Sequence, residues 1–476
     1  MRLFLPGIVG YLDMMRQAVF SISALLFASA FLQLGGGLLG TVVALRMAVA
    51  EFPVFIAGAV VSGYFIGYVL GVFYSHRLID GVGHIRAFAA LASLLSAATL
   101  LHPFLVSPIP WGGLRFVQGF CLAGLAVCTE SWLNERATNE IRGRILSLYM
   151  IVMYLALVCG QLLLSVPDPS GFGLFVISSV LLSLALVPVA ATRVQAPVPQ
   201  PPSRFSFREL WEISPLGVTG SFSSGLILGS FYGLMPFFAE STGLTTTGTS
   251  HLMAATIFGG LVFQWPIGRL SDRIDRRLIL VVMTGLASVI AAVIFAALTL
   301  PVWDVNPRWL LLGMAPLLGA AVFSIYPLSV AHTNDFIDPS HLVSASAGLI
   351  LAYGVGAIIG PPVASGLMEL IGPIGLFVFF GAAGLTTAAF GAWRMSVRPA
   401  VPVEDRDPFH LVTRTTTMSS ELDPRGETEE TEEDTEEGGS AQPGEDAASE
   451  PESELEPVET ETEPPENDER APKDAN

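Results

Sequence analysis

Three short segments of the sequence place charged or amide side chains at spacings that could do chemistry. The first is GRLSDRIDRR at 268–277, with six charges in ten positions between two long apolar runs. Asp272 can cap a helix N-terminus or pair with an arginine, and arginines bind carboxylates or anionic lipid headgroups. Contacts of this kind can form and break, so the segment is a candidate latch. The simpler alternative is a fixed anchor of positive charge. The latch candidates are Gly268, Asp272, Arg273, Arg276 and Arg277.

The second segment is RFVQG at 115–119, inside an apolar run. If this run crosses a membrane, Arg115 is a functional candidate, because an intramembrane arginine is costly unless it faces partners or water. Gln118 is expected to share its polar environment. The alternative is an arginine that extends to the outer headgroups, since Trp111 places the interface only one turn away.

The third segment is ESWLNERATNEIRGR at 130–144, where carboxylates and guanidinium groups alternate. These groups can pair with the loop that carries Asp80, and we expect a charge network that opens and closes with a gate. A fixed surface network is the alternative. The residues concerned are Glu130, Glu135, Arg136, Arg142 and Arg144.

The composition shows which kind of protein positions these groups. The chain has 476 residues, of which 51% are hydrophobic, and a mean hydropathy of +0.59. These values are far too apolar for a soluble protein of this size and predict a membrane protein surrounded by lipid. Residues 1–400 carry 19 Arg against 16 acids, whereas residues 401–476 carry 5 basic residues against 26 acids. The net charge of -18 therefore comes from the tail, and no nucleic-acid partner is expected.

The apolar runs predict the fold class: an all-α integral membrane protein with twelve transmembrane helices. A helix needs about 20 mostly apolar residues to cross a bilayer. The predicted spans are 18–45, 53–74, 87–107, 110–131, 145–166, 171–192, 213–239, 250–268, 278–300, 308–331, 342–366 and 371–393. Because the number is even, both termini lie on one side of the membrane.

Arginine positions predict which side that is. Sixteen arginines fall on the side of the termini, and only Arg46 and Arg308 fall on the other. Positive residues in short loops stay in the cytoplasm, so both termini are predicted to be cytoplasmic. The seven tryptophans fall near predicted span ends, as an interfacial aromatic belt requires.

Four regions follow from this layout: a six-helix bundle over 1–192, a cytoplasmic linker over 193–212, a second bundle over 213–395 and an acidic tail over 396–476. The bundles are expected to be pseudo-repeats, because an offset of 192 aligns Asp80 with Asp272 and Gly67 with Gly259. Parallel repeats of this kind are a transporter architecture. The tail has too few apolar residues to bury a core and is predicted to be disordered.

These segments carry a resemblance to a known family. GRLSDRIDRR resembles the signature loop of the major facilitator superfamily, with a Gly, an Asp four residues on, an Arg, and a basic pair after the next turn. RFVQG is similar to the superfamily's Arg-x-x-Gln-Gly motif, whose arginine is associated there with proton or substrate coupling. With AVFSIYPLSVAHTND at 321–335 and GLILAYGVGAIIGPP at 348–362, the chain looks like the YcaD-like bacterial branch. The resemblance covers most of 18–395 and none of the tail.

The resemblance implies a secondary transporter in the bacterial cytoplasmic membrane that moves a small-molecule substrate by alternating access. The latch would then hold the cytoplasmic ends of the two bundles together in the outward-facing state. The first copy of the loop, at 75–86, keeps Asp80, Gly83 and Arg86 but has His76 and Gly81 where the signature has Gly and Arg.

The superfamily fold also implies a central cavity lined mainly by spans 1, 4, 7 and 10, with contributions from 2, 5, 8 and 11. Its polar and aromatic candidates suggest a mostly neutral, aromatic cavity, and each alone could be a packing residue. They are Gln33, Tyr64, Tyr68, Gln118, Tyr154, Gln161, Tyr232, Gln264, Tyr326 and Tyr353. A coupling proton would have to use Glu130, His332 or a site that the sequence does not reveal, and uniport remains open. Arg115 would anchor an anionic substrate.

Three alternatives to transport of an organic solute are a copper carrier, an enzyme, and a sensor or scaffold. Met235, His251 and Met253 could suit copper(I), but their spacing forms no ligand motif, so no metal site is expected. No nucleophile motif or nucleotide-binding glycine loop indicates an enzyme, and no cofactor is expected. A sensor or scaffold acting through the tail is a further alternative. The protein is expected to be a monomer.

Overall fold

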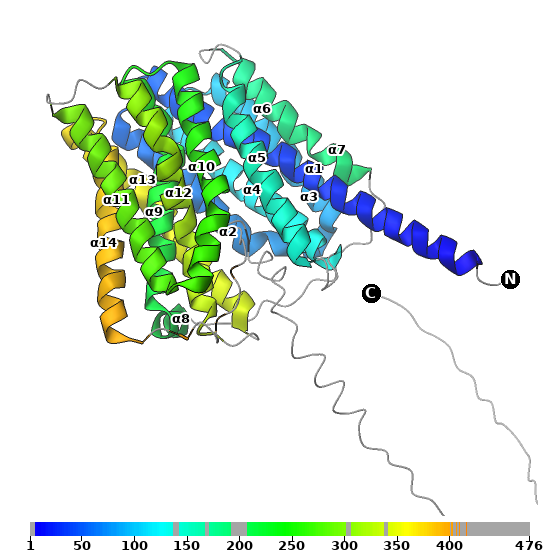
Figure 1. Cartoon of the computed structure of the whole chain (residues 1–476). Helices are drawn as coiled ribbons and strands as arrows, with labels where there is room; N and C mark the ends of the chain where they lie inside the picture. The colour runs from blue at the N-terminus through cyan, green and yellow to red at the C-terminus, as the bar shows by residue number, and fades with distance from the viewer. Residues whose placement is uncertain are drawn as a thin grey trace, which may run out of the picture. The chain divides into compact units, whose positions relative to one another are not determined.

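The computed structural model describes residues 5–136, 142–166, 171–191, 207–300, 306–337, 341–399, 401–402, 406, 409 and 416. This part of the chain is helical and contains no strand. Its helices are α1 Leu5–Val49, α2 Val54–Val82, α3 His84–Leu101, α4 Pro108–Arg136, α5 Arg142–Leu163, α6 Gly173–Leu184, α7 Leu186–Ala190, α8 Phe207–Ile213, α9 Pro215–Ser241, α10 Thr246–Arg273, α11 Arg276–Thr299, α12 Pro307–Asn334, α13 Leu342–Ile371 and α14 Gly375–Val397. We call α1–α7 the N-half and α9–α14 the C-half (Figure 1).

Eleven of the described helical segments are long and apolar enough to cross a membrane. Each coincides with one of the predicted spans, and the sixth consists of α6 and α7, which are separated at Ala185. The remaining prediction, 250–268, falls on α10, which has 28 residues but a polar first half with Thr, Ser and His side chains. Its lower hydropathy explains why composition alone does not mark it as a span.

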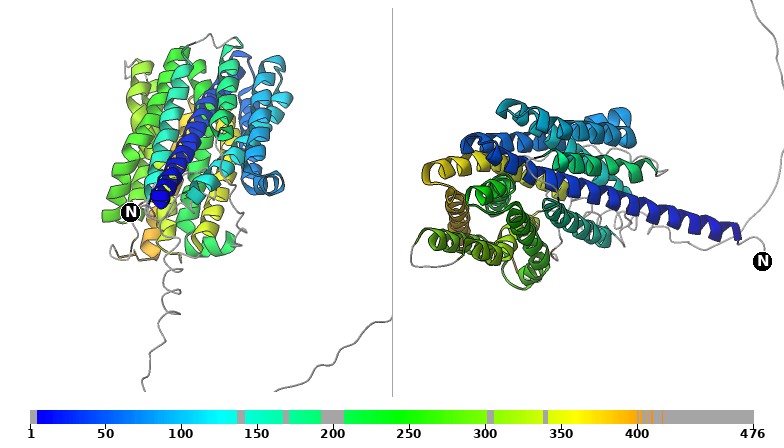
Figure 2. Two further views of the ribbon diagram at one scale, coloured as in Figure 1. Left: turned by 90° about the vertical axis from the view of Figure 1, so that its right-hand side faces the viewer. Right: turned by 90° about the horizontal axis from the view of Figure 1, so that it is seen from above.

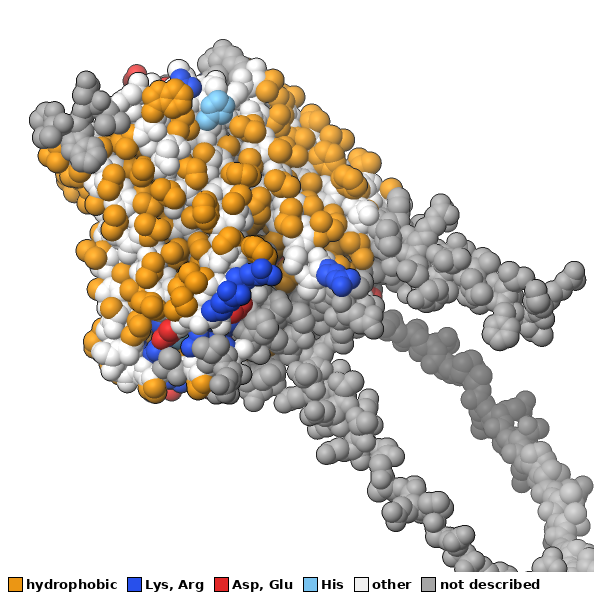
Figure 3. All heavy atoms as spheres, viewed as in Figure 1, with side chains coloured by type: hydrophobic (Ala, Val, Ile, Leu, Met, Phe, Trp, Pro, Cys, Tyr) orange, Lys and Arg blue, Asp and Glu red, His pale blue; other side chains and the backbone are white. Residues whose placement is uncertain are grey.

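The surface of the bundle is suited to lipid. Large apolar side chains are exposed along the outer faces of the helices, as Figure 3 shows. Examples from four helices are Leu94, Val180, Val289 and Leu385. Most Arg, Asp and Glu side chains visible in Figure 3 gather at the end where α8 lies, which we call the loop end. The segment 268–277 is at this end.

The predicted interfacial aromatic belt is wrong for two of the tryptophans. Trp111 and Trp132 are 0% and 2% exposed, and the indole of Trp111 donates to the carbonyl of His102. Trp211, Trp265, Trp309 and Trp393 are exposed, as a belt requires. Trp303 lies outside the described residues. Nearness to a span end in sequence does not fix which face of the helix a residue occupies, so Trp111 and Trp132 are core residues.

Close helix packing follows the same plan in both halves. A Cβ atom at Gly67 of α2 would overlap the carbonyl of Phe116 on α4. A Cβ atom at Gly259 of α10 would overlap the carbonyl of Pro316 on α12. Small residues permit such close approach between membrane helices. The two glycines that the offset of 192 aligns therefore have the same structural task.

The halves meet at the end opposite the loop end. Ser62 of α2 donates to the carbonyl of Ile358 on α13, at 2.6 Å. Ser250, near the start of α10, donates to the carbonyl of Gln161, near the end of α5, at 2.7 Å. In Figure 2, seen from above, the blue-to-cyan N-half and the green-to-orange C-half lie side by side.

The beginning of the predicted tail takes part in the bundle. Helix α14 continues to Val397, and Arg398 donates to the carbonyl of Ile213 at 2.7 Å. Arg406, Phe409 and Thr416 also contact the helices. The tail was predicted to be disordered from residue 396 onward, and these contacts show that the prediction is wrong for the residues that make them. The strongly acidic part of the tail lies outside the described residues.

Candidate functional site

A cavity of about 220 Å³ lies between the two halves. Its wall comes from six helices, which are α1, α2, α4 and α5 of the N-half and α9 and α13 of the C-half. These helices correspond to the predicted spans 1, 2, 4, 5, 7 and 11. Spans 8 and 10, which the resemblance also implied, provide none of the described lining residues.

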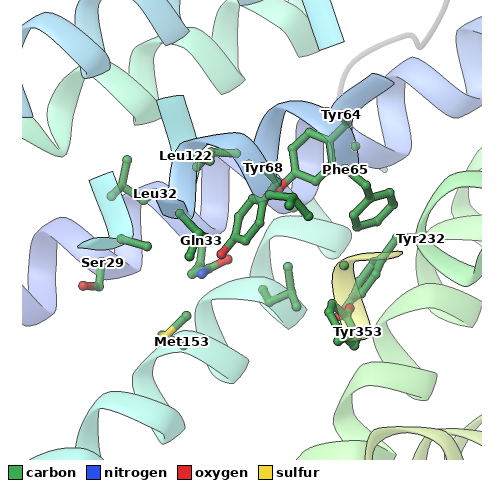
Figure 4. A pocket seen from close by; sticks show the side chains of 18 of the residues that line it. Ser29, Leu32, Gln33, Tyr64, Phe65, Tyr68, Leu122, Met153, Tyr232 and Tyr353 are labelled. Atoms are coloured by element: carbon green, nitrogen blue, oxygen red, sulfur yellow. The ribbon is translucent and has the colours of Figure 1, made fainter. Parts of the chain in front are cut away.

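Tyrosine side chains dominate the polar part of the wall. Figure 4 shows Tyr68 directed toward Gln33, with Tyr232 and Tyr353 together on the C-half side. The rings of Tyr64 and Tyr68 are 5.9 Å apart and inclined at 38°. The tyrosines of the wall are Tyr64, Tyr68, Tyr149, Tyr154, Tyr232 and Tyr353. The wall therefore offers aromatic faces together with hydroxyl groups.

Arg115 is the one charged side chain among the described residues of the wall, which include no carboxylate. It is 6% exposed, and its guanidinium lies 4.4 Å from the centre of the Tyr64 ring. Its Nη1 donates to Gln118 at 3.1 Å, and its Nε has no hydrogen-bond partner in the described part of the chain. Arg115 thus lies inside the bundle, not at the headgroups.

The other predicted glutamines lie behind the wall. Gln118 is buried and lies 3.3 Å from the ring of His102. Gln161 accepts from Thr41 at 2.7 Å and donates to the carbonyl of Gly37 at 3.0 Å. Gln264 is buried, and its amide nitrogen has no hydrogen-bond partner among the described residues. The amides of Gln118 and Gln161 are thus used in contacts within the protein, whereas Gln33 faces the cavity.

Two further candidates also lie outside the wall. Tyr326 packs edge-on against Tyr353, with ring centres 5.6 Å apart. His332 is buried and packs edge-on against Phe336 near the loop end, with ring centres 5.1 Å apart. Tyr326 therefore supports a residue of the wall, and His332 does not face the cavity.

Glu130 is fully buried in α4 and connects the loop end to the cavity. Tyr149 of α5 donates to Glu130 Oε1 at 3.0 Å, and Tyr149 itself lines the cavity. Thr416 donates to the other carboxylate oxygen. Sequence reasoning included Glu130 but missed Tyr149, although Tyr149, Met153 and Leu157 follow one another at intervals of four on one face of α5.

In the segment 268–277 the charges pair within the C-half. Arg276 donates to Asp272 at 2.9 Å, to the carbonyl of Ala331 at 3.0 Å and also to Asp335. Arg276 is thereby anchored to the C-terminal ends of both α10 and α12.

Asp275 caps α11 by accepting from the backbone of Arg277 at 3.0 Å. The side chain of Arg277 also pairs with Asp275. Burial alone would raise the pKa of Asp275, but the hydrogen bonds from Arg277 and the charges of Arg277 and Arg406 lower it below its ordinary value.

The remaining gate candidates lie at the loop end without described ion pairs between them. Gly83 ends α2 with a positive φ of 84°, and its N–H donates to the carbonyl of Ile79. The exposed charged residues are Asp80, Arg86, Glu135, Arg144 and Arg273. The side chains of Arg136 and Arg142 are outside the described set. The predicted network around Asp80 therefore stays a prediction.

Among the described residues, no cluster supports the copper hypothesis. Met235 and Met253 are buried in the core, whereas His251 is exposed. Within the described ranges, no group of three His, Cys, Asp or Glu side chains could hold a metal ion.

Comparison with known proteins identifies the family. The model of the Major Facilitator Superfamily matches residues 25–304 and 217–422. The chain is also 32% identical over 349 residues to an uncharacterized MFS-type transporter of Enterobacter sp., which covers 71% of this chain and 86% of the relative. The chain belongs to the major facilitator superfamily. The uncharacterized MFS-type transporter YcaD of Salmonella newport is 31% identical over 355 residues, covering 73% of this chain and 89% of that one.

Solved structures of superfamily transporters share the fold. A point variant of the nucleoside transporter NupG matches with a TM-score of 0.65 and 13% identity, over 79% of this chain and 99% of that one. A D-xylose-proton symporter matches with a TM-score of 0.59 and 15% identity, over 79% and 96%. The family model and the two relatives confirm the predicted superfamily and its YcaD-like branch, and the chain is a multi-pass membrane transporter and not an enzyme.

Proposed function

We propose that this superfamily member is a secondary transporter for a small organic anion with an aromatic group, which it moves by alternating access through the tyrosine-lined cavity. The observation that carries this proposal is Arg115. It is a buried guanidinium in a wall without a described carboxylate, and its Nε has no described hydrogen-bond partner. Burying such a charge is costly unless something pairs with it. A substrate anion supplies that pair.

The rest of the wall favours an aromatic substrate. Tyrosine faces stack on aromatic rings, and their hydroxyls together with the Gln33 amide can orient polar substituents. A volume of about 220 Å³ is below the range of about 300–1,000 Å³ typical of drug-sized ligands. The cavity therefore fits a single small metabolite better than a drug.

The membrane arrangement of the proposal has twelve spans, with α10 as the eighth, and two related six-helix halves. Charged residues gather at the loop end, which we place in the cytoplasm together with both termini. The halves hydrogen-bond at the opposite end through Ser62 and Ser250. We therefore assign the structure to a state closed toward the outside, in which Arg276 and Arg277 pair within their own half and the proposed latch is open.

Proton coupling, in this proposal, uses Glu130. Its carboxylate is buried and reaches the cavity wall through Tyr149. A carboxylate can couple transport to a proton when its access alternates between the two sides. One of the solved structures with this fold is a proton symporter, which fits this mode of transport.

Ligand binding tests the proposed substrate class. Purified protein is screened by thermal shift against sets of aromatic compounds that differ only in a carboxylate, an amide or an amine. The carboxylates should raise the melting temperature, and Arg115→Ala should abolish that rise while Arg115→Lys keeps part of it. Stabilisation by the amines alone, or an equal response in Arg115→Ala, would contradict the proposal.

A further inference from the structure

The chain that follows α14 returns to the signature loop of the C-half. The backbone N–H of Phe409 donates to Asp272 Oδ1 at 2.8 Å, the same oxygen that accepts from Arg276. The Phe409 ring covers Gly268 so closely that a Cβ atom there would overlap it. The close neighbour that Gly268 admits is therefore Phe409, not a second helix.

Two arginines fasten this part of the chain further. Arg406 donates to the carbonyl of Ile274 at 2.8 Å, and its charge lies close enough to Asp275 to lower the pKa of that carboxyl. Arg277 donates to the carbonyl of Arg398 at 2.6 Å. The turn between α10 and α11 is thus tied to Arg398, Arg406 and Phe409 by backbone and side-chain groups.

Thr416, seven residues after Phe409 in the sequence, contacts the N-half. Thr416 is 0% exposed and donates its hydroxyl to Glu130 Oε2, while Tyr149 of the cavity wall donates to Oε1. Phe409 and Thr416 therefore bind one residue of each half, Asp272 and Glu130. Both halves contribute these residues near the loop end, where they have to move relative to each other during alternating access.

We propose that Arg406, Phe409 and Thr416 form an intramolecular clamp. These three residues hold the loop ends of the two halves at one spacing, and Thr416 and Phe409 must leave Glu130 and Asp272 before those ends can move. The clamp binds Asp272 and covers Gly268, so it competes with any contact that these two signature residues make to the N-half. A negative charge at position 416 would repel Glu130 and release the clamp.

Spin-label distances test the clamp without any substrate. Cys121, Cys128 and Cys159 are first replaced by serine, and labels are placed at Ser147→Cys on α5 and Leu278→Cys on α11, two exposed positions near the loop end. The protein carrying only these changes should give one narrow distance distribution. Thr416→Glu should raise the ratio of a second population to the first at least about tenfold, the effect of losing one hydrogen bond to a charged group. Phe409→Ala keeps the backbone N–H that donates to Asp272 but removes the ring that covers Gly268, so it should raise the same ratio through lost packing.

Two controls separate release from misfolding. Thr416→Ser keeps the hydroxyl, and a chain ending at residue 428 keeps all three clamp residues, so both should give the narrow distribution. Phe409→Ala leaves the contact between Thr416 and Glu130 unchanged. Release in this variant therefore cannot come from a folding defect caused by a second carboxylate beside Glu130. Identical distributions in all variants, or two populations already present with the clamp intact, would overturn the proposal.

Discussion

Arg115 sets the electrostatic character of the cavity. The motif spacing suggested that Gln118 shares the polar environment of this residue, and in the structure Arg115 donates to Gln118. Sequence left open whether the side chain faced the interior or the headgroups, because a helix near the interface allows either direction. Its burial at 6% exposure shows that it faces the interior.

Sequence did not predict the contacts that Tyr149 and Thr416 make with Glu130. Tyr149 lies in a helix that is apolar over most of its length, so hydropathy does not distinguish its face from the others. Thr416 lies 286 residues after Glu130, in a polar stretch without periodicity, and no local signal links the two. Contacts of this kind depend on tertiary packing.

Glu130→Gln tests the coupling role at the same scale. The substitution preserves the shape of the side chain but removes the titratable group and one of its two accepting oxygens. Uptake driven by a pH gradient should disappear in proteoliposomes, while uptake down the substrate's own gradient remains. Glu240→Gln is the matched control, because Glu240 lies near the C-terminal end of α9, away from the loop end. This variant should keep the response to the pH gradient. A full response in Glu130→Gln would place coupling elsewhere.

Asp275 gives a pH-dependent stability whose sign follows from its lowered pKa. A lowered folded-state pKa means that its ionised form stabilises the protein above the unfolded-state value of about 3.9. That contribution is lost as the pH falls through the still lower folded-state pKa. Asp275→Asn keeps the cap of α11 but not the charge, so its melting temperature should be below that of the unsubstituted protein at pH 7 and approach it at acidic pH. A difference that does not change with pH would show that the charge contributes nothing.

At the scale of helices, sequence predicted the spans well because each needs a long apolar run. It predicted less about which helix faces touch, as the buried Trp111 and Trp132 show. The glycine pair was the exception, since the repeat offset pointed to Gly67 and Gly259 before their contacts were known. A repeated glycine carries packing information that hydropathy lacks.

Gly259→Ala tests the close approach of α10 and α12. The added methyl would overlap the carbonyl of Pro316, so the variant should lose about 1–3 kcal/mol of stability. Gly313→Ala is the matched control on α12, because a Cβ atom there meets nothing within 4 Å and alanine favours the helix by about 1 kcal/mol. In thermal denaturation in detergent, the melting temperature of Gly259→Ala should be below that of the unsubstituted protein and that of Gly313→Ala above it. Equal melting temperatures would show that the helices can separate without cost.

At the scale of the whole molecule, we expect transport to depend on the helical body and not on the acidic tail. Residues beyond 428 are predominantly polar and acidic and cannot bury a core. A chain ending at residue 428 should therefore transport at the rate of the full chain, measured as uptake at equal reconstituted amounts. A complete loss of uptake would favour the alternative in which the tail serves a sensor or scaffold.

The central claim is that the cavity carries a small aromatic anion held by Arg115. Its most direct test is uptake of a radiolabelled aromatic carboxylate, chosen by thermal shift, into proteoliposomes with and without an inwardly directed proton gradient. We predict saturable uptake that the proton gradient accelerates and that Arg115→Ala reduces at least about tenfold, the effect of losing one charge-assisted contact. Uptake that is equal in Arg115→Ala and the unsubstituted protein, or no uptake of any carboxylate under either gradient, would contradict the account.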